Sequence, residues 1–81
     1  MTEVHEPIRV GAIFSRGTVA IRWLFWRGRR ISIERVTFSW KETDGSRQVW
    51  KFALSNGTEV FEVSFYPADC RWYLEKIHGE G

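Results

Sequence analysis

The sequence predicts an all-β fold: a single small antiparallel meander of about six strands, curled into a barrel or half-barrel roll. Apolar residues recur at every second position in most windows, which is the period of a strand, and helical spacing is nearly absent. Short connections separate these segments at regular spacing, as in a meander. The chain has 81 residues, 16% of them aromatic, and large rings fill a small core at modest entropic cost. We expect one domain over residues 1–81, with flexible tails at 1–6 and 78–81.

The first two strands are predicted to form a hairpin. Residues 8–14 alternate between apolar side chains and others, and residues 18–26 form a second apolar segment. The Ser-Arg-Gly sequence at 15–17 supplies a turn between them. Two extended segments with so short a connection are expected to pair with each other.

The third strand is predicted to start near Arg30, after a tight turn. Gly28 can take the positive φ that such a turn demands. Downstream, Ile31 and Ile33 occupy odd-numbered positions, whereas Val36, Phe38 and Trp40 occupy even-numbered ones. In a regular strand these two groups would lie on opposite faces of the sheet, so about half of the apolar side chains would point outward. A bulge near Glu34 and Arg35 would return them all to one face.

Three further strands complete the predicted meander. They cover residues 48–54, 58–65 and 71–77. A polar loop with Asp44 and Gly45 at its apex precedes them. Asn56-Gly57 is the strongest turn signal, because this pair fits a type I′ turn between two strands, and Pro67 interrupts the pattern before the last strand.

Alternation also predicts which side chains share a face in two of these strands. The residues expected to face the core are Trp50, Phe52, Leu54, Phe61, Val63 and Phe65. Glu62 and Ser64 lie between core positions, so we expect both to face water.

The basic charge belongs to the first half of the chain. The net charge is +2, yet residues 7–35 hold seven arginines against one acid. Aromatic residues are interleaved with arginines from position 22 to position 40. Rings that stack on bases, beside guanidinium groups that meet phosphates, are typical of β-sheets that bind single-stranded nucleic acid. The candidate nucleic-acid-binding residues are Arg22, Arg27, Arg29, Arg30, Arg35, Trp23 and Phe25.

A purely structural explanation of the same stretch is also open. In any small β-domain, aromatic residues make the core while arginine keeps the exposed face soluble. Residues 18–26 do not fit this explanation fully, because odd-numbered and even-numbered positions, which face opposite sides of a strand, are both mostly apolar, and Arg22 is the only charged residue. A strand that is apolar on both faces either lies under something or exposes an apolar stripe. The alternative function is therefore protein interaction, most simply a homodimer with the interface Val19, Ile21, Trp23 and Phe25.

The sequence offers no recognisable catalytic or metal-binding set. It contains no G-x-S-x-G elbow, no phosphate loop and no metal-spaced histidines and cysteines. His5 and His78 fall in the expected tails, where a catalytic base is hard to hold in place. Cys70 has no second thiol to pair with and no base beside it. We therefore expect a non-enzymatic protein without cofactor or metal.

The start of the chain carries acids where a signal peptide would carry a basic end and an apolar run. No stretch approaches the roughly 20 apolar residues of a membrane span. These features favour a cytoplasmic protein with no membrane partner.

Three features along the chain match a known pattern. The segment LFWRGR at 24–29 leads into alternating branched residues, Trp40 follows, and WYLE at 72–75 closes the chain. In these features the chain resembles, over nearly its whole length, a family of small uncharacterised bacterial all-β domains. It departs from the family pattern at Ile21, where that pattern has proline, and at Leu24, where it often has phenylalanine.

The resemblance implies an orientation and a setting. In the family pattern, Leu24 and Trp26 point inward, which would leave Trp23 and Phe25 outside. Some members are attached to, or found near, proteins that look like Y-family DNA polymerases. The resemblance therefore implies a DNA-repair context, with nucleic acid or a DNA-repair protein as the partner.

Overall fold

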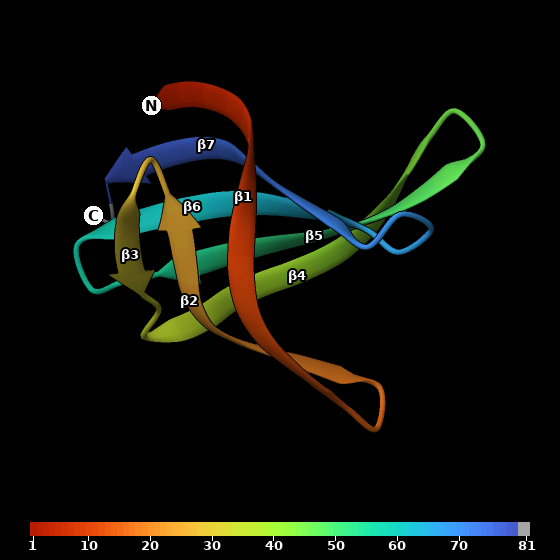
Figure 1. The fold of residues 1–81 in the computed structure, drawn as a ribbon, viewed down its shortest axis with the longest axis horizontal. Helices are drawn as coiled ribbons and strands as arrows, with labels where there is room; N and C mark the ends of the chain where they lie inside the picture. The colour runs from red at the N-terminus through yellow and green to blue at the C-terminus, as the bar shows by residue number, and fades with distance from the viewer. Residues whose placement is uncertain (80–81) are drawn as a thin grey trace.

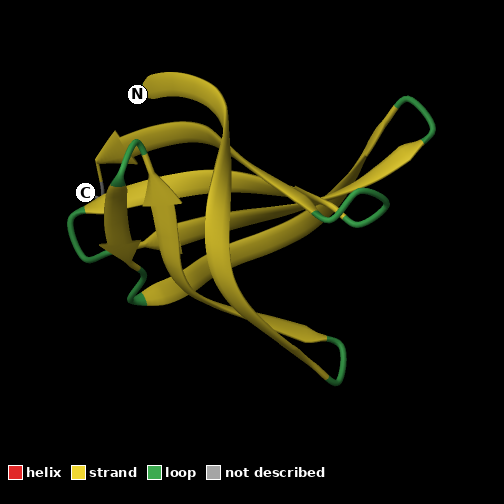
Figure 2. Cartoon of the chain, viewed as in Figure 1, coloured by secondary structure: helices red, strands yellow, loops and turns green. Residues whose placement is uncertain are grey.

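The computed structural model describes residues 1–79, which form one antiparallel sheet of seven strands (Figures 1 and 2). The strands are β1 (Thr2–Ser15), β2 (Thr18–Trp26), β3 (Arg29–Ser32), β4 (Arg35–Asp44), β5 (Arg47–Ser55), β6 (Glu59–Tyr66) and β7 (Arg71–Gly79). Their order in the sheet is β3-β2-β1-β7-β6-β5-β4. Two meanders, β1 to β3 and β4 to β7, are therefore joined where the first strand pairs with the last. The all-β class and the antiparallel meander are confirmed.

Of the two predicted forms, a barrel or a half-barrel roll, the closed barrel is not formed by the described residues. β3 and β4 lie at opposite ends of the strand order, and no pairing joins them within residues 1–79. Ile33 and Glu34 connect these two strands outside the sheet ladder. The Ile33 N–H donates to the Arg22 carbonyl at 2.9 Å, and the Glu34 N–H donates to the Ser55 carbonyl at 2.7 Å. The connection thus ties the two ends of the sheet together at one point without closing it.

The same connection explains why the sheet has seven strands where about six were expected. The segment predicted as a third strand with a bulge is divided into β3 and β4. At Ile33 and Glu34 the backbone bonds to two different strands, β2 and β5, so it cannot continue one ladder. Ile31 and Val36 both face the core, but a second irregularity, a bulge at Thr37, turns Phe38 and Trp40 outward. The expectation that all these apolar residues share one face is therefore wrong for Phe38 and Trp40.

Two of the predicted turns are confirmed by the backbone angles, whereas the type I′ turn predicted at Asn56-Gly57 is not, because Asn56 lacks the positive φ that such a turn needs. Arg27 and Gly28 lie between β2 and β3 with φ values of 51° and 74°. Arg16 and Gly17 lie between β1 and β2 with φ values of 46° and 81°. Two consecutive residues with positive φ are what a tight two-residue hairpin turn requires. Each hairpin therefore has its register fixed by its turn.

The core lies on the inner face of the curled sheet, where the two meanders pack against each other. Its buried members are Ile21, Leu24, Ile31, Phe52, Leu54, Phe61, Val63, Phe65 and Leu74. Five of the six predicted core residues of β5 and β6 are buried, and Trp50 packs against the cluster while half-buried. Ser64 was expected to face water but is fully buried. It is covered because Glu75, the extra residue of a bulge in β7, accepts a hydrogen bond from the Ser64 hydroxyl at 2.7 Å.

The structure also differs from the expectation of flexible tails. β1 begins at Thr2, which pairs with Ile77 of β7, and β7 continues through Gly79. Residues 80–81 of the second predicted tail lie outside the described residues. Both ends of the described chain are thus strands of the same sheet. Residues 1–79 contain no helix that is long and apolar enough to cross a membrane.

Candidate nucleic-acid interface

A β-bulge at Arg22 sets the orientation of the second half of β2. Ala12 of β1 pairs with Ile21, whereas the preceding residue, Gly11, pairs with Trp23. Arg22 is therefore an extra residue without a partner in the ladder. Such an insertion reverses the parity of every side chain that follows it.

The bulge separates two groups of apolar residues that look continuous in the sequence. Before it, Ile21 points inward and is only 4% exposed. After it, Leu24 and Trp26 point inward, as the family resemblance implies, and both belong to the core or pack against it. Trp23 and Phe25 lie on the outer face, and Phe25 is 38% exposed.

The expected homodimer stripe is corrected by this geometry. Ile21 is a core residue, and Val19 is half-buried against the core. Only Trp23 and Phe25 of the four interface candidates face outward. Before Arg22 the odd-numbered residues of β2 point inward, and after it the even-numbered residues do. The odd-numbered residues therefore lie on two different faces of the sheet and do not form one surface.

Trp23 lies flat on the backbone of β1 at Gly11. A Cβ atom added at position 11 would approach the indole ring to 2.2 Å, closer than real Cβ contacts allow. Only glycine therefore leaves room for the indole in this position. Arg30 also approaches this ring, with its guanidinium carbon 5.3 Å from the centroid of the Trp23 ring.

Phe25 forms a similar pair with Arg9 of β1. These two residues face each other in the β1–β2 ladder, and the Arg9 guanidinium carbon lies 5.8 Å from the centroid of the Phe25 ring. Cations at this range are attracted to the ring face. We call this outer surface the arginine–aromatic face. It consists of Arg9, Arg22, Trp23, Phe25 and Arg30.

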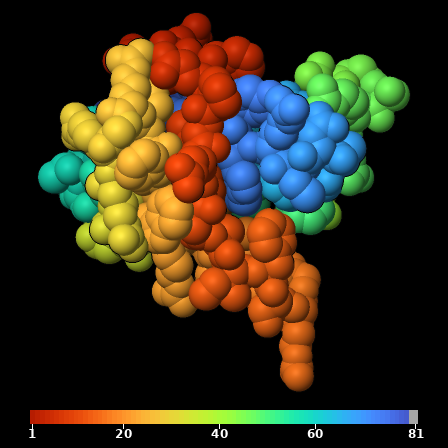
Figure 3. Space-filling view, in the orientation of Figure 1, coloured from red at the N-terminus to blue at the C-terminus, as the bar shows by residue number. Residues whose placement is uncertain are grey.

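Arg9 was not among the sequence candidates, although its signal was present. It is an outward position of the alternating segment 8–14, and the predicted hairpin places it opposite β2. A hollow of about 510 Å³ continues the face toward β7, where Arg71 and Tyr73 help to line it. Figure 3 shows β3, β2, β1 and β7 side by side on this side of the molecule. No local pattern could show that residues of β7 adjoin this face, because only the pairing of the first strand with the last brings them there.

Arg27 is engaged elsewhere. Its guanidinium donates to both carboxylate oxygens of Glu6, at 2.6 and 3.2 Å, and lies over the Trp26 ring. The Trp26 indole N–H donates to the same carboxylate at 2.9 Å. The hydrogen bond from Arg27, followed by that from Trp26, lowers the pKa of Glu6. The charge of Arg27 is therefore matched by Glu6 at the edge of the face.

The remaining two candidates are not part of the arginine–aromatic face. Arg29 pairs with Trp26 across the hairpin, so it shares the side of Trp26, opposite to Trp23. Arg35 lies at the start of β4, with its guanidinium 3.5 Å from the Glu34 carboxylate. The structure thus gathers Arg22, Arg30, Trp23 and Phe25 of the predicted set and adds Arg9.

A second polar cluster lies where two bulges meet on the outer side of β7. Glu75 accepts hydrogen bonds from Ser64 and from His5 Nδ1, the latter at 2.6 Å. Burial raises the pKa of Glu75, but the hydrogen bonds from His5 and Ser64 outweigh it, so the pKa is lowered overall. Because Ser64 is fully buried, a substrate has no access to its hydroxyl, so this arrangement carries no argument for nucleophilic catalysis.

The described residues, 1–79, contain no group of three or more histidine, cysteine, aspartate or glutamate side chains that could hold a metal ion. Cys70 is exposed and free. No protein-family model, curated protein or solved structure matches this chain. The arginine–aromatic face is therefore characterised by its own geometry alone.

Proposed function

We propose that this chain is a non-enzymatic binding module that holds single-stranded nucleic acid on the arginine–aromatic face. The observation that supports this most strongly is the pairing of rings and cations: Trp23 with Arg30, and Phe25 with Arg9. Both rings lie on the same outer face of one strand, two residues apart, which is a spacing of about 6.6 Å.

Such a surface fits single strands better than duplexes. A ring on a sheet can stack on a base only when the base has a free face, and every base has one in a single strand. Arg9, Arg22 and Arg30 form no ion pair with a carboxylate of residues 1–79, so their charges are available for phosphates. We expect binding without sequence preference, because stacking and phosphate contacts do not read base edges.

The setting follows from the family resemblance. It supports a bacterial role in DNA repair, in which exposed single strands arise. The proposal requires no cofactor, since stacking and charge neutralisation suffice for binding.

Fluorescence anisotropy with a labelled oligothymidine tests the proposal. If three arginines contact phosphates, the logarithm of affinity falls with a slope of about −2 against the logarithm of salt concentration, so affinity drops about 20-fold between roughly 50 and 200 mM salt. Phe25→Ala should weaken binding by about 1–3 kcal/mol. Phe38→Ala is the matched control, because Phe38 is a strand phenylalanine that is 64% exposed on β4, away from this face.

Two results would reject the proposal. One is the absence of binding at low salt. The other is equal loss of affinity in Phe25→Ala and Phe38→Ala, because a specific stacking surface must distinguish these two rings.

A further inference from the structure

The open side of the sheet presents two strand edges without partners. β3 covers β2 only from Trp23 to Trp26, so the residues Thr18–Ile21 pair with β1 alone. β4 is the last strand in the order and pairs with β5 alone. Within residues 1–79 these two edges remain unpaired in the sheet. We call the space between them the seam.

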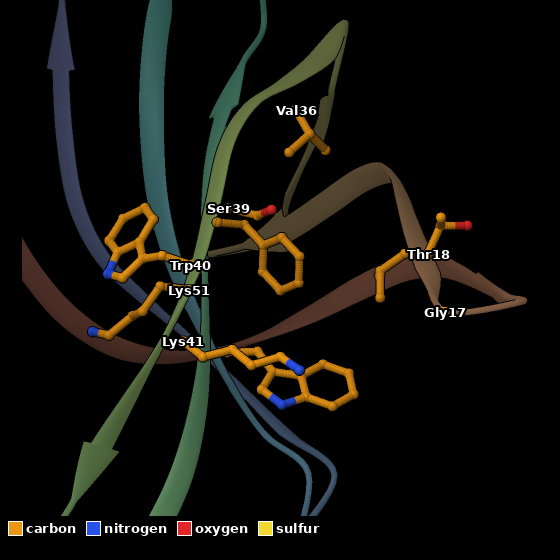
Figure 4. A pocket seen from close by; sticks show the side chains of 10 residues that line it. Gly17, Thr18, Val36, Ser39, Trp40, Lys41 and Lys51 are labelled. Atoms are coloured by element: carbon orange, nitrogen blue, oxygen red, sulfur yellow. The ribbon is translucent and has the colours of Figure 1, made fainter.

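A cavity of about 370 Å³ occupies the seam. It is lined by Thr18 and Val19 from the β2 side and by Val36 and Lys41 from the β4 side, with Phe52 among its apolar walls. Figure 4 shows Lys41 extending from β4 toward the Thr18 side, while Trp40 and Lys51 lie on the other side of the β4 ribbon. The cavity is thus lined by apolar side chains together with the hydroxyl groups of Thr18 and Ser39, and its charged lining residues are lysines.

The charge at the seam has one sign. No aspartate or glutamate is among the described residues that line this cavity or the adjoining hollow, whereas Lys41 and Arg16 are. Phe14, in the adjoining hollow, is half exposed even though it contacts the rings of Trp50 and Phe65. The surroundings therefore favour an occupant that is both apolar and acidic.

We propose that the seam accepts an extended segment of another protein, which adds to the sheet as a strand along β4 and faces Thr18–Ile21 of β2. Unpaired backbone N–H and C=O groups at strand spacing are best satisfied by another polypeptide backbone. Val36, Phe52 and Lys41 share the inner face of the sheet, so they meet the same alternate set of side chains of the segment. Apolar members of this set pack against Val36 and Phe52, and an acidic member at its end pairs with Lys41. Four residues of β2 span roughly 13 Å, so a segment of four or five residues fills the seam.

The chain itself offers no donor for this position among its described residues. Every strand from β1 to β7 is already paired in the sheet. A segment from a partner protein is therefore the occupant that fits. This inference is independent of nucleic-acid binding, because it uses a different surface.

A synthetic peptide tests the proposal. The probe is a fluorescein-labelled, capped Val-Thr-Val-Thr-Glu peptide, whose first, third and fifth side chains share one face, measured by anisotropy and by NMR of the full chain. Amide resonances of residues 18–21 and 36–41 should shift, and their hydrogen exchange should slow. A peptide of the same sequence with alternate backbone amides methylated keeps the side chains but loses hydrogen-bond donors, so it should bind at least about tenfold more weakly.

Charge reversal tests the role of Lys41. Lys41→Glu should weaken binding of the acidic probe about fivefold, whereas Lys76→Glu, on β7, should leave it within a factor of about two. Replacing glutamate by lysine in the peptide should restore binding to Lys41→Glu.

Four outcomes would overturn the proposal: no binding of the probe, equal binding of the methylated peptide, resonance shifts outside the seam, or occupation of the seam by a second copy of the chain or by an oligonucleotide instead of the peptide. The outcomes with the peptide do not bear on the arginine–aromatic face, which is tested with its own ligand and variants, whereas an oligonucleotide in the seam would count against both proposals.

Discussion

The indole of Trp23 rests on the backbone of Gly11, and this contact holds the outer aromatic ring in place. A Cβ at position 11 would come within 2.2 Å of the ring. The bulge at Arg22 supplies the other half of the arrangement, because it turns Trp23 outward while its neighbours on both sides of the bulge stay in the core.

Replacing Gly11 by alanine is expected to displace the indole and to lower the free energy of unfolding by about 1–3 kcal/mol, as overpacking does. Urea denaturation measures this change. Gly79→Ala is the control, because an added Cβ at position 79 meets nothing within 4 Å. Equal stability of the Gly11 and Gly79 variants would show that Trp23 does not lie on β1.

Deleting Arg22 tests the bulge. Without this extra residue the ladder becomes regular, and Ile21, Trp23 and Leu24 keep their faces. The deletion removes the carbonyl that accepts from Ile33, so we expect a loss of about 1–2 kcal/mol. Deleting Phe25 instead would turn Trp26 out of the core and should cost about 3 kcal/mol or more. If the two deletions rank in the opposite order by thermal denaturation, Arg22 is not the bulged residue.

Acid should destabilise the protein through Glu6 and Glu75. The pKa of each carboxyl is lowered in the folded state from the ordinary value of 4.5. A lowered folded-state pKa means that the contribution to stability is fully present above pH 4.5 and is lost as the pH falls through the folded-state value. Denaturation curves at several pH values should show this fall, and it should be smaller in Glu6→Gln and Glu75→Gln. A stability that rises with acid over this interval would contradict the assignment.

The arginines of the outer face should determine the salt dependence of nucleic-acid binding. Arg9→Ala and Arg30→Ala should each reduce the steepness of the salt dependence by about 0.7, the value for one phosphate contact to a single strand. Arg47→Ala is the control, because Arg47 is paired with Asp69 on the far part of the sheet. Unchanged slopes for Arg9→Ala and Arg30→Ala would mean that these residues do not meet phosphates.

Local patterns predicted most strand segments and turns, because alternation and two-residue turns are properties of neighbouring residues. The turn at Arg27 and Gly28 and the inward positions of Phe61 and Val63 are examples. The bulge at Arg22 could not be located in the same way. Odd-numbered and even-numbered positions of β2 are both mostly apolar, so the sequence does not show which of them face the core on each side of Arg22.

Long-range contacts account for the other differences. The pairing of β1 with β7 brings Arg71 near the outer face and orders residues predicted to be tails. Glu34 leaves the β2–β3 hairpin because its N–H group bonds to Ser55 of β5, a strand far away in the sequence. Neither effect has a signature in a short window of residues.

An NMR titration with a single-stranded oligonucleotide at low salt decides whether the arginine–aromatic face is the binding surface. We expect the Trp23 indole resonance and the amides of Arg9, Phe25 and Arg30 to shift together, while the indole of Trp40 on β4 stays unchanged. Saturable binding that leaves the Trp23 indole in place and shifts only residues of β4 and β5, or no binding at all, would contradict the proposed function.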